Sequence, residues 1–219
     1  MGNQENLTPM SQGPIATPYD YHFLLQYVSK LRKDMFGRDF IIDDVDKPVI
    51  TKLLAYFLKD KTVAEAEGLD LKKGVLLMGP TGCGKTAIMK IMSNFCAAKD
   101  RLEFRSSNEV VLDFDTRAYE AIIQFTKKSF YSTGHPRVYC FDDLGLEPDG
   151  HHYGKSVNVM REVLLSRYNY FISRRMITHV TTKLYSEELG ERYGEHIRSR
   201  MREMFNRVLY VDSSPDKRH

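Results

Sequence analysis

The sequence predicts an α/β domain with a five-stranded parallel sheet and helices on both faces, and three observations support this. Short apolar runs typical of buried strands recur along the chain, and helical stretches separate them. Strands joined by helical crossovers form parallel sheets, whose faces the helices then cover. The first run also leads into a glycine-rich loop and a helix. The predicted strands are residues 74–79, 102–107, 137–143, 176–182 and 207–212, and the predicted helices between them are about 85–98, 116–128, 156–173 and 194–205.

Length and composition exclude several classes of protein. The 219 residues, 42% of them hydrophobic, suffice for one domain with short additions. A net charge of +3 means that any nucleic-acid contact must come from local basic patches. Three cysteines without metal-ligand spacing favour a reducing compartment. No apolar run reaches the roughly 18 residues of a membrane span, so we expect a cytoplasmic protein with no membrane partner.

The chain divides into four predicted parts. Residues 1–18 are polar and rich in Pro and Gly, which predicts a disordered tail. Residues 19–70 are predicted to be a helical N-terminal extension and a possible arm for docking a partner. Residues 71–211 form the main domain, and 212–219 a C-terminal tail.

Two helices are predicted in the N-terminal extension. Within residues 19–40, Phe23, Tyr27 and Leu31 have helical spacing. The second helix is better marked, because Asp46 lies near its start and Pro48 suits its first turn. Its apolar face predicts that it packs on the main core.

The glycine-rich loop after the first strand matches the phosphate-binding pattern G-x-x-x-x-G-K-[ST] in full. Glycines let backbone N–H groups approach phosphate oxygens at the start of a helix. Lys85 is predicted to reach the β- and γ-phosphates of ATP, and Thr86 to bind Mg²⁺. The alternative is a glycine-rich turn before an ordinary helix. The predicted nucleotide-binding residues are Gly79, Pro80, Thr81, Gly82, Cys83, Gly84, Lys85 and Thr86.

Two carboxylates end the third predicted strand, at the edge where open α/β sheets bind ligands. Asp142 is predicted to hold Mg²⁺ together with Thr86, and Asp143 to orient or deprotonate the attacking water. The alternative is a polar strand end that caps a turn. The side chain of Asp143 is one methylene shorter than a Glu in the same role would be. We therefore expect slow hydrolysis of ATP to ADP and phosphate without an activating partner.

Five segments of the chain, which include the phosphate loop and the acidic strand end, resemble the AAA+ ATPases of the DnaC/IstB type. This family comprises helicase loaders and transposase helper ATPases. The resemblance implies a P-loop NTPase fold with strand order 5-1-4-3-2. The sequence departs from the family pattern after the fifth predicted strand, where we expect no helical C-terminal lid. The segments that carry the resemblance are KGVLLMGPTGCGKT, YCFDDLGLE, LLSRYNYF, ITHVTTKL and EELGERYGEHIRSRMREMF.

The same resemblance assigns roles to residues near the end of the chain. It implies that Arg200 is an arginine finger that reaches the γ-phosphate in a neighbouring subunit. Lys183 stands where the family usually has an Asn that senses the γ-phosphate, and is a site candidate with Thr182 as the fallback. In the family, the lid carries a sensor arginine. Lys217 or Arg218 is a candidate to replace it, although a disordered C-terminal tail is the preferred interpretation.

The resemblance also implies the partners. They are a homo-oligomer with ATP at the subunit interface, a replicative helicase or a transposase, and single-stranded or double-stranded DNA. A nucleotide-binding scaffold with negligible hydrolysis and a small-molecule kinase are the alternatives. His151 and His152 are predicted to lie in a flexible loop without a zinc site. The candidate DNA contacts are Lys30, Arg32, Lys33, Lys127, Lys128, Arg174 and Arg175, with Tyr19, Tyr21 and Phe23 as candidates for base stacking.

Overall fold

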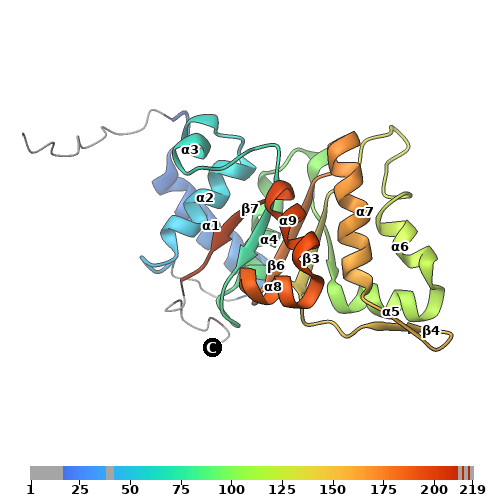
Figure 1. Cartoon of the computed structure of the whole chain (residues 1–219). Helices are drawn as coiled ribbons and strands as arrows, with labels where there is room; N and C mark the ends of the chain where they lie inside the picture. The colour runs from blue at the N-terminus through green and yellow to red at the C-terminus, as the bar shows by residue number, and fades with distance from the viewer. Residues whose placement is uncertain (1–16, 38–41, 212–213, 215–216, 218–219) are drawn as a thin grey trace, which may run out of the picture.

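A five-stranded parallel sheet forms the centre of the molecule (Figure 1). The computed structural model describes residues 17–37, 42–211, 214 and 217. The strand order is β2-β3-β6-β1-β7, which is the predicted 5-1-4-3-2 order read from the opposite edge. Every neighbouring pair is parallel, so the predicted fold class is confirmed. The strands are β1 (Gly74–Met78), β2 (Glu103–Ser106), β3 (Tyr139–Leu144), β6 (Thr178–Thr182) and β7 (Phe205–Leu209).

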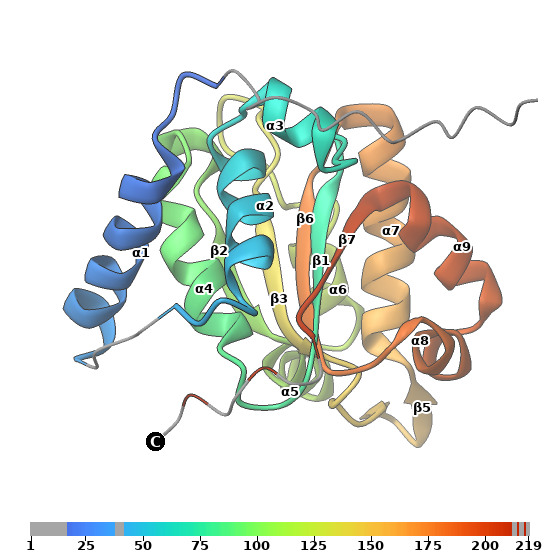
Figure 2. The same ribbon diagram turned by 90° about the vertical axis from the view of Figure 1, so that its left-hand side faces the viewer.

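Helices cover both faces of the sheet, as Figure 2 shows. Side chains alternate across a strand, so Val75 and Leu77 of β1 pack on one face while Leu76 and Met78 pack on the other. The first face carries α1 (Tyr21–Phe36), α2 (Lys47–Phe57), α3 (Lys61–Ala66) and α4 (Lys85–Met92). The second face carries α5 (Ser107–Arg117), α6 (Tyr119–Phe125), α7 (Val159–Arg174), α8 (Ser186–Tyr193) and α9 (Glu195–Met204).

The two N-terminal helices belong to the core. In α2, Ile50, Leu53 and Leu54 are fully buried, which confirms that this helix packs on the main core. The helix begins after Asp46 with a proline in its first turn, as predicted. The predicted tail lies outside the described residues up to position 16. Thr17 is described, and its hydroxyl donates to the carboxylate of Asp60.

Several predicted boundaries were wrong. The helix predicted over 85–98 ends at Met92 and is followed by two short 3₁₀ turns, Ser93–Phe95 and Ala98–Asp100. The range 116–128, predicted as one helix, contains the end of the unpredicted α5 and all of α6, which are separated at Ala118 by its φ of 51°. The last strand starts at Phe205 rather than 207.

The prediction that His151 and His152 lie in a flexible loop was wrong in its secondary structure. These residues belong to a two-stranded hairpin, β4 (Gly150–His152) and β5 (Lys155–Val157), which Figure 1 places at the end of the molecule remote from α1. Among the described residues no cluster of His, Cys, Asp or Glu is arranged to hold a metal ion. None of the described helices has both the length and the apolar character that crossing a bilayer requires.

Candidate functional site

The glycine-rich loop connects β1 to α4, and its backbone conformation requires glycine. Gly82 and Gly84 have φ values of 87° and 92°, in the left-handed region that side chains disfavour. A Cβ on Gly79 would lie 2.6 Å from the Cβ of Tyr210. The glycines of the phosphate-binding pattern therefore correspond to real steric demands of this loop.

Lys85 and Thr86 begin α4 and point their polar atoms toward the loop and β3. Lys85 is 6% exposed, and its Nζ donates to the carbonyl oxygens of Gly79 and Pro80, both at 2.8 Å. The hydroxyl of Thr86 lies 2.9 Å from both carboxylate oxygens of Asp142. The side chains predicted to bind phosphate and Mg²⁺ are thus brought together from the start of α4 and the end of β3.

A third strand contributes Thr181, which sequence reasoning missed. Its hydroxyl donates to Asp142 Oδ1 at 2.5 Å and accepts the backbone N–H of Asp143 at 3.0 Å. Asp143 itself has a φ of 55° and lies where the β3–β6 register shifts between Phe141 and Leu144. Because of this bend, the carboxylates of the consecutive residues Asp142 and Asp143 can take different places in the site.

The loop and the strand ends surround a cavity of about 520 Å³. This volume is within the range of roughly 300–1,000 Å³ found for small-molecule and cofactor sites. Four basic side chains against one carboxylate make the lining suitable for a polyphosphate. The lining residues are Arg32, Phe36, Thr81, Gly82, Gly84, Lys85, Thr86, Ala87, Asp143, Leu146, Lys183 and Lys217.

The C-terminal segment also reaches this cavity. The backbone N–H of Lys217 donates to the Gly82 carbonyl at 3.0 Å, and its Nζ pairs with the buried carboxylate of Asp46. Burial lowers the pKa of Lys217 to about 8. Arg218, the alternative candidate, lies outside the described residues.

The donor set fits a nucleotide with Mg²⁺. A hydroxyl and a carboxylate side by side are oxygen ligands of the kind that Mg²⁺ prefers. Positive-φ glycines and the start of a helix supply backbone N–H groups for phosphate. Cys83, in contrast, is 1% exposed and packs in the core, and its Sγ lies 4.0 Å from Lys85 Nζ.

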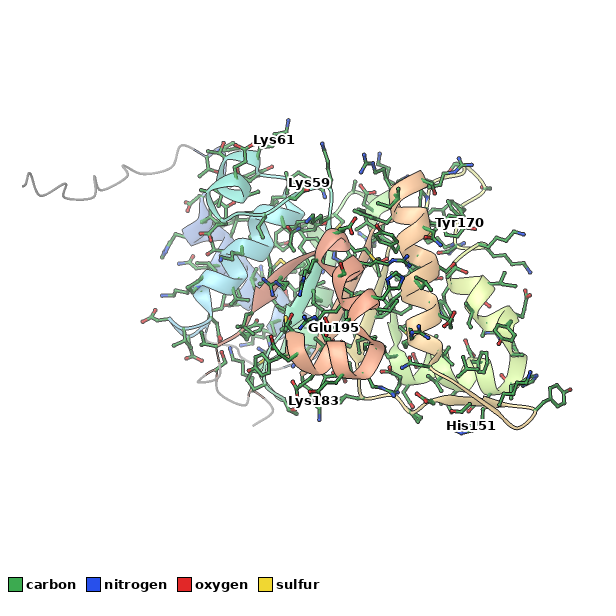
Figure 3. All side chains as sticks on the ribbon, in the orientation of Figure 1. Lys59, Lys61, His151, Tyr170, Lys183 and Glu195 are labelled. Carbon is green, nitrogen blue, oxygen red and sulfur yellow. The ribbon has the colours of Figure 1, made fainter. Side chains whose placement is uncertain are left out.

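The candidates after β6 have separate environments. Lys183 is exposed and lines the cavity, and Figure 3 shows it at the same end of the sheet. Thr182 is fully buried, and its hydroxyl donates to the Leu144 carbonyl at 2.7 Å and accepts the Leu184 N–H at 3.0 Å. Thr181, rather than the fallback Thr182, contacts the acidic pair.

Arg200 lies on α9, outside the lining of this cavity. The apolar face of the helix is buried, while Arg198 pairs with Glu195 at 2.7 Å and Arg200 stacks over the ring of Tyr168 at 4.9 Å. The two arginines therefore leave the helix toward different neighbours. Nothing in this position brings Arg200 to its own subunit's phosphate loop.

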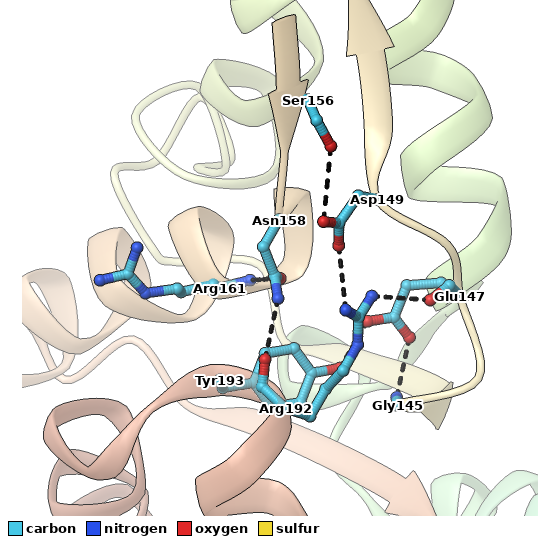
Figure 4. Close-up of polar contacts among 8 residues, drawn as sticks. All are labelled: Gly145, Glu147, Asp149, Ser156, Asn158, Arg161, Arg192 and Tyr193. Atoms are coloured by element: carbon cyan, nitrogen blue, oxygen red, sulfur yellow. Dashed lines mark hydrogen bonds and ion pairs between the residues drawn. The ribbon is translucent and has the colours of Figure 1, made fainter.

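A second network missed by sequence reasoning joins the loop after Asp143 to α8 (Figure 4). Glu147 is 4% exposed and accepts hydrogen bonds from the Gly145 N–H, at 2.8 Å, and from the Tyr193 hydroxyl. Arg192 donates to the Glu147 carbonyl at 2.9 Å and pairs with Asp149 at 3.0 Å. The sequence signal that could have indicated this network is an acidic residue, Glu147, shortly after the Asp142-Asp143 pair at the end of a strand. The network ties the cavity's edge to the helix pair that ends in α9.

The fold is shared with solved structures of replication proteins. A protein assigned as a primosome component of Streptococcus pyogenes serotype M3 matches with a TM-score of 0.55 and 14% identity over 82% of this chain and 87% of that one. DnaI matches with a TM-score of 0.53 and 18% identity over 80% and 89%. Domain III of the Thermotoga maritima replication initiation protein DnaA matches with a TM-score of 0.51 and 14% identity over 78% and 65%.

No protein-family model matches the sequence, and no curated protein matches it. The strand order, the phosphate loop and the structural matches together define a P-loop α/β fold that this chain shares with these solved structures. The fold implied by the sequence motifs is therefore confirmed.

Proposed function

We propose that the protein binds ATP with Mg²⁺ in the 520 Å³ cavity and hydrolyses it to ADP and phosphate. The observation that carries this proposal is the meeting of Lys85, Thr86 and Asp142 at the end of β1 and β3. A turn that merely precedes a helix would not need a buried lysine, a hydroxyl–carboxylate pair and a basic cavity in one place.

Each residue has a distinct task in this proposal. The loop N–H groups and Lys85 bind the phosphates, and Thr86 and Asp142 hold Mg²⁺. Bound Mg²⁺ supplies charge neutralisation at the phosphoryl oxygens. Asp143, exposed beside the cavity, orients the attacking water. Thr181 positions both carboxylates, because its hydroxyl contacts the side chain of one and the backbone of the other.

We further propose that ATP lies at an interface between copies of this chain. The cavity of one copy contains no group from α9, whereas Arg200 is presented on the surface beside Tyr168. In a ring or filament, Arg200 of one copy would complete the site of the next and stabilise charge developing on the γ-phosphate.

We propose that the protein acts in DNA replication, as a helicase loader in the cytoplasm. Support comes from the fold shared with DnaI and with DnaA domain III. The sequence motifs fit a transposase helper ATPase as well, and the two roles differ in their DNA. Stimulation of hydrolysis by single-stranded DNA supports the loader, and stimulation by duplex alone supports the helper.

The experiment that tests the ATPase proposal measures ATP binding and hydrolysis in parallel. Lys85→Ala should abolish both, because the variant removes the cation held at the loop. Lys90→Ala is the matched control, since Lys90 lies on the same helix outside the cavity and its Nζ lies 5.8 Å from the centre of the Phe104 ring. Equal binding by wild type and Lys85→Ala would contradict the proposal.

A further inference from the structure

A second cavity, of about 310 Å³, lies at the opposite end of the sheet. Figure 3 shows the separation, because Lys59, which lines this second cavity, and Lys183, which lines the first, are labelled at opposite ends of the molecule. The walls are aromatic and come from the end of α2 and the turn after α4, namely Tyr56, Phe57 and Phe95. Neither the phosphate loop nor Arg200 reaches this cavity.

One polar group in the wall is His179, which is 2% exposed. Its Nδ1 accepts the backbone N–H of Val75 at 3.1 Å. Burial lowers the pKa of His179 to about 3, so the ring is neutral and its proton resides on Nε2. No described residue offers a hydrogen-bond acceptor to Nε2. Nε2 is not one of the fully buried polar atoms of the described residues, so its N–H can be reached from the cavity and can donate to an acceptor bound there.

Lys59 supplies a positive charge at the same cavity. Its backbone is in the left-handed region with a φ of 58°, and its Nζ lies 4.6 Å from the centre of the Tyr56 ring. No carboxylate of the described chain lies within ion-pair distance of Lys59. The acidic lining residue, Asp100, lies 3.2 Å from His135; burial lowers the pKa of Lys59, and the charge of Asp100 partly opposes that shift.

We propose that this second cavity binds a small aromatic carboxylate. The ring of the ligand packs among Tyr56, Phe57 and Phe95, and its carboxylate accepts the Nε2–H of His179 and is neutralised by Lys59. Lys59 is exposed and its charge is hydrated without a ligand, so it attracts a carboxylate more strongly than an uncharged ring and repels a cation. The proposal does not depend on ATP hydrolysis, because no group is shared between the two cavities.

The test is a titration of the full chain, labelled with ¹⁵N, with indole-3-carboxylate. The expected result is saturable one-to-one binding that shifts the imidazole ¹⁵N signals of His179. Indole-3-carboxamide, which lacks the charge, should bind about tenfold more weakly. Lys59→Gln should weaken binding of the carboxylate by about the same factor.

Lys61→Gln is the matched control, because Lys61 is a neighbouring exposed lysine outside the cavity (Figure 3). It should leave the affinity unchanged. Ala97→Phe is a second variant, which fills the cavity from an exposed lining position and should abolish binding even where Lys59→Gln folds poorly. No shift of the His179 signals by either probe would overturn the proposal and assign the cavity to water. Equal affinity of wild type, Lys59→Gln and Ala97→Phe would overturn it as well.

Discussion

The Thr181 hydroxyl donates to Asp142 Oδ1 at 2.5 Å and accepts the backbone N–H of the next residue, Asp143, at 3.0 Å. One side chain on β6 therefore holds both carboxylates that end β3. The contact also bridges the register shift between the two strands, where Asp143 adopts its positive φ. Two adjacent acidic residues can have different roles because Thr181 stabilises this bend.

Thr181→Val removes that hydroxyl while keeping the shape of the side chain. We expect kcat for ATP hydrolysis to fall about 10- to 100-fold, as when the hydrogen-bond partner of a metal ligand is lost. Thr181→Ser keeps a hydroxyl and should recover most of the activity. Steady-state hydrolysis alongside thermal unfolding checks this, and a variant that folds as wild type and retains full kcat would contradict it.

Arg200→Ala should lower kcat by roughly 10³-fold or more while nucleotide affinity changes little, because an arginine finger acts on transition-state charge. Mixing equal amounts of Arg200→Ala and Lys85→Ala should restore activity. In a mixed cyclic assembly about one quarter of the interfaces combine an intact Lys85 with a neighbour's intact Arg200. No recovery on mixing, with assembly confirmed by mass, would show that Arg200 does not act between subunits.

Arg167 is buried completely and uses all five N–H donors without a carboxylate partner. The acceptors are the hydroxyls of Thr178 and Ser129 and the carbonyls of Phe125, Arg137 and Ile177. Arg167→Lys, with three donors, leaves acceptors unpaired and should lower the free energy of unfolding by about 3 kcal/mol.

Arg161→Lys is the control for that measurement. Arg161 lies on the same helix and its guanidinium is exposed, with Glu162 at 3.6 Å as its ion-pair partner. Its substitution should change the free energy of unfolding by less than about 0.5 kcal/mol. Similar losses for both variants in denaturant titrations would show that Arg167 makes no special contribution.

His179 makes stability depend on acid. Burial, with the nearby positive charges of Lys59 and Arg167, lowers its pKa from 6.5 to about 3 in the folded state. The unfolded chain therefore binds a proton that the folded chain does not between these pH values. The free energy of unfolding should fall by about 1.4 kcal/mol per pH unit from this group as the pH drops below 6.5. Denaturant titrations at several pH values should show a shallower fall for His179→Gln, and an unchanged slope would contradict the assignment.

The features that could be predicted from the sequence depend on residues that are close together along the chain. The apolar run of β1, the glycines and Lys85 occupy consecutive positions, so strand, loop and helix could be inferred together. The order of the strands followed from the resemblance to a family and is confirmed by the pairing. Asp46 and Pro48 likewise marked the start of α2 correctly.

What could not be predicted depends on contacts between distant segments. Thr181 and Asp142 are 39 positions apart, and their contact requires a bend at Asp143 that no side-chain pattern announces. The split between α5 and α6 occurs at Ala118, a residue that favours helices, so propensity pointed the wrong way. Lys217 joins the cavity through tertiary contacts with Gly82 and Asp46.

The most direct test is single-turnover hydrolysis of ATP by wild type and Asp143→Asn, with nucleotide affinity measured on the same samples. It tests whether the protein hydrolyses ATP with Asp143 orienting the attacking water. Asp143 lines the cavity, and its backbone N–H donates to the Thr181 hydroxyl at 3.0 Å. We expect Asp143→Asn to bind ATP as wild type does and to lose about 10²-fold or more in hydrolysis rate. Equal rates for the two proteins, or no hydrolysis by wild type with DNA present, would contradict it.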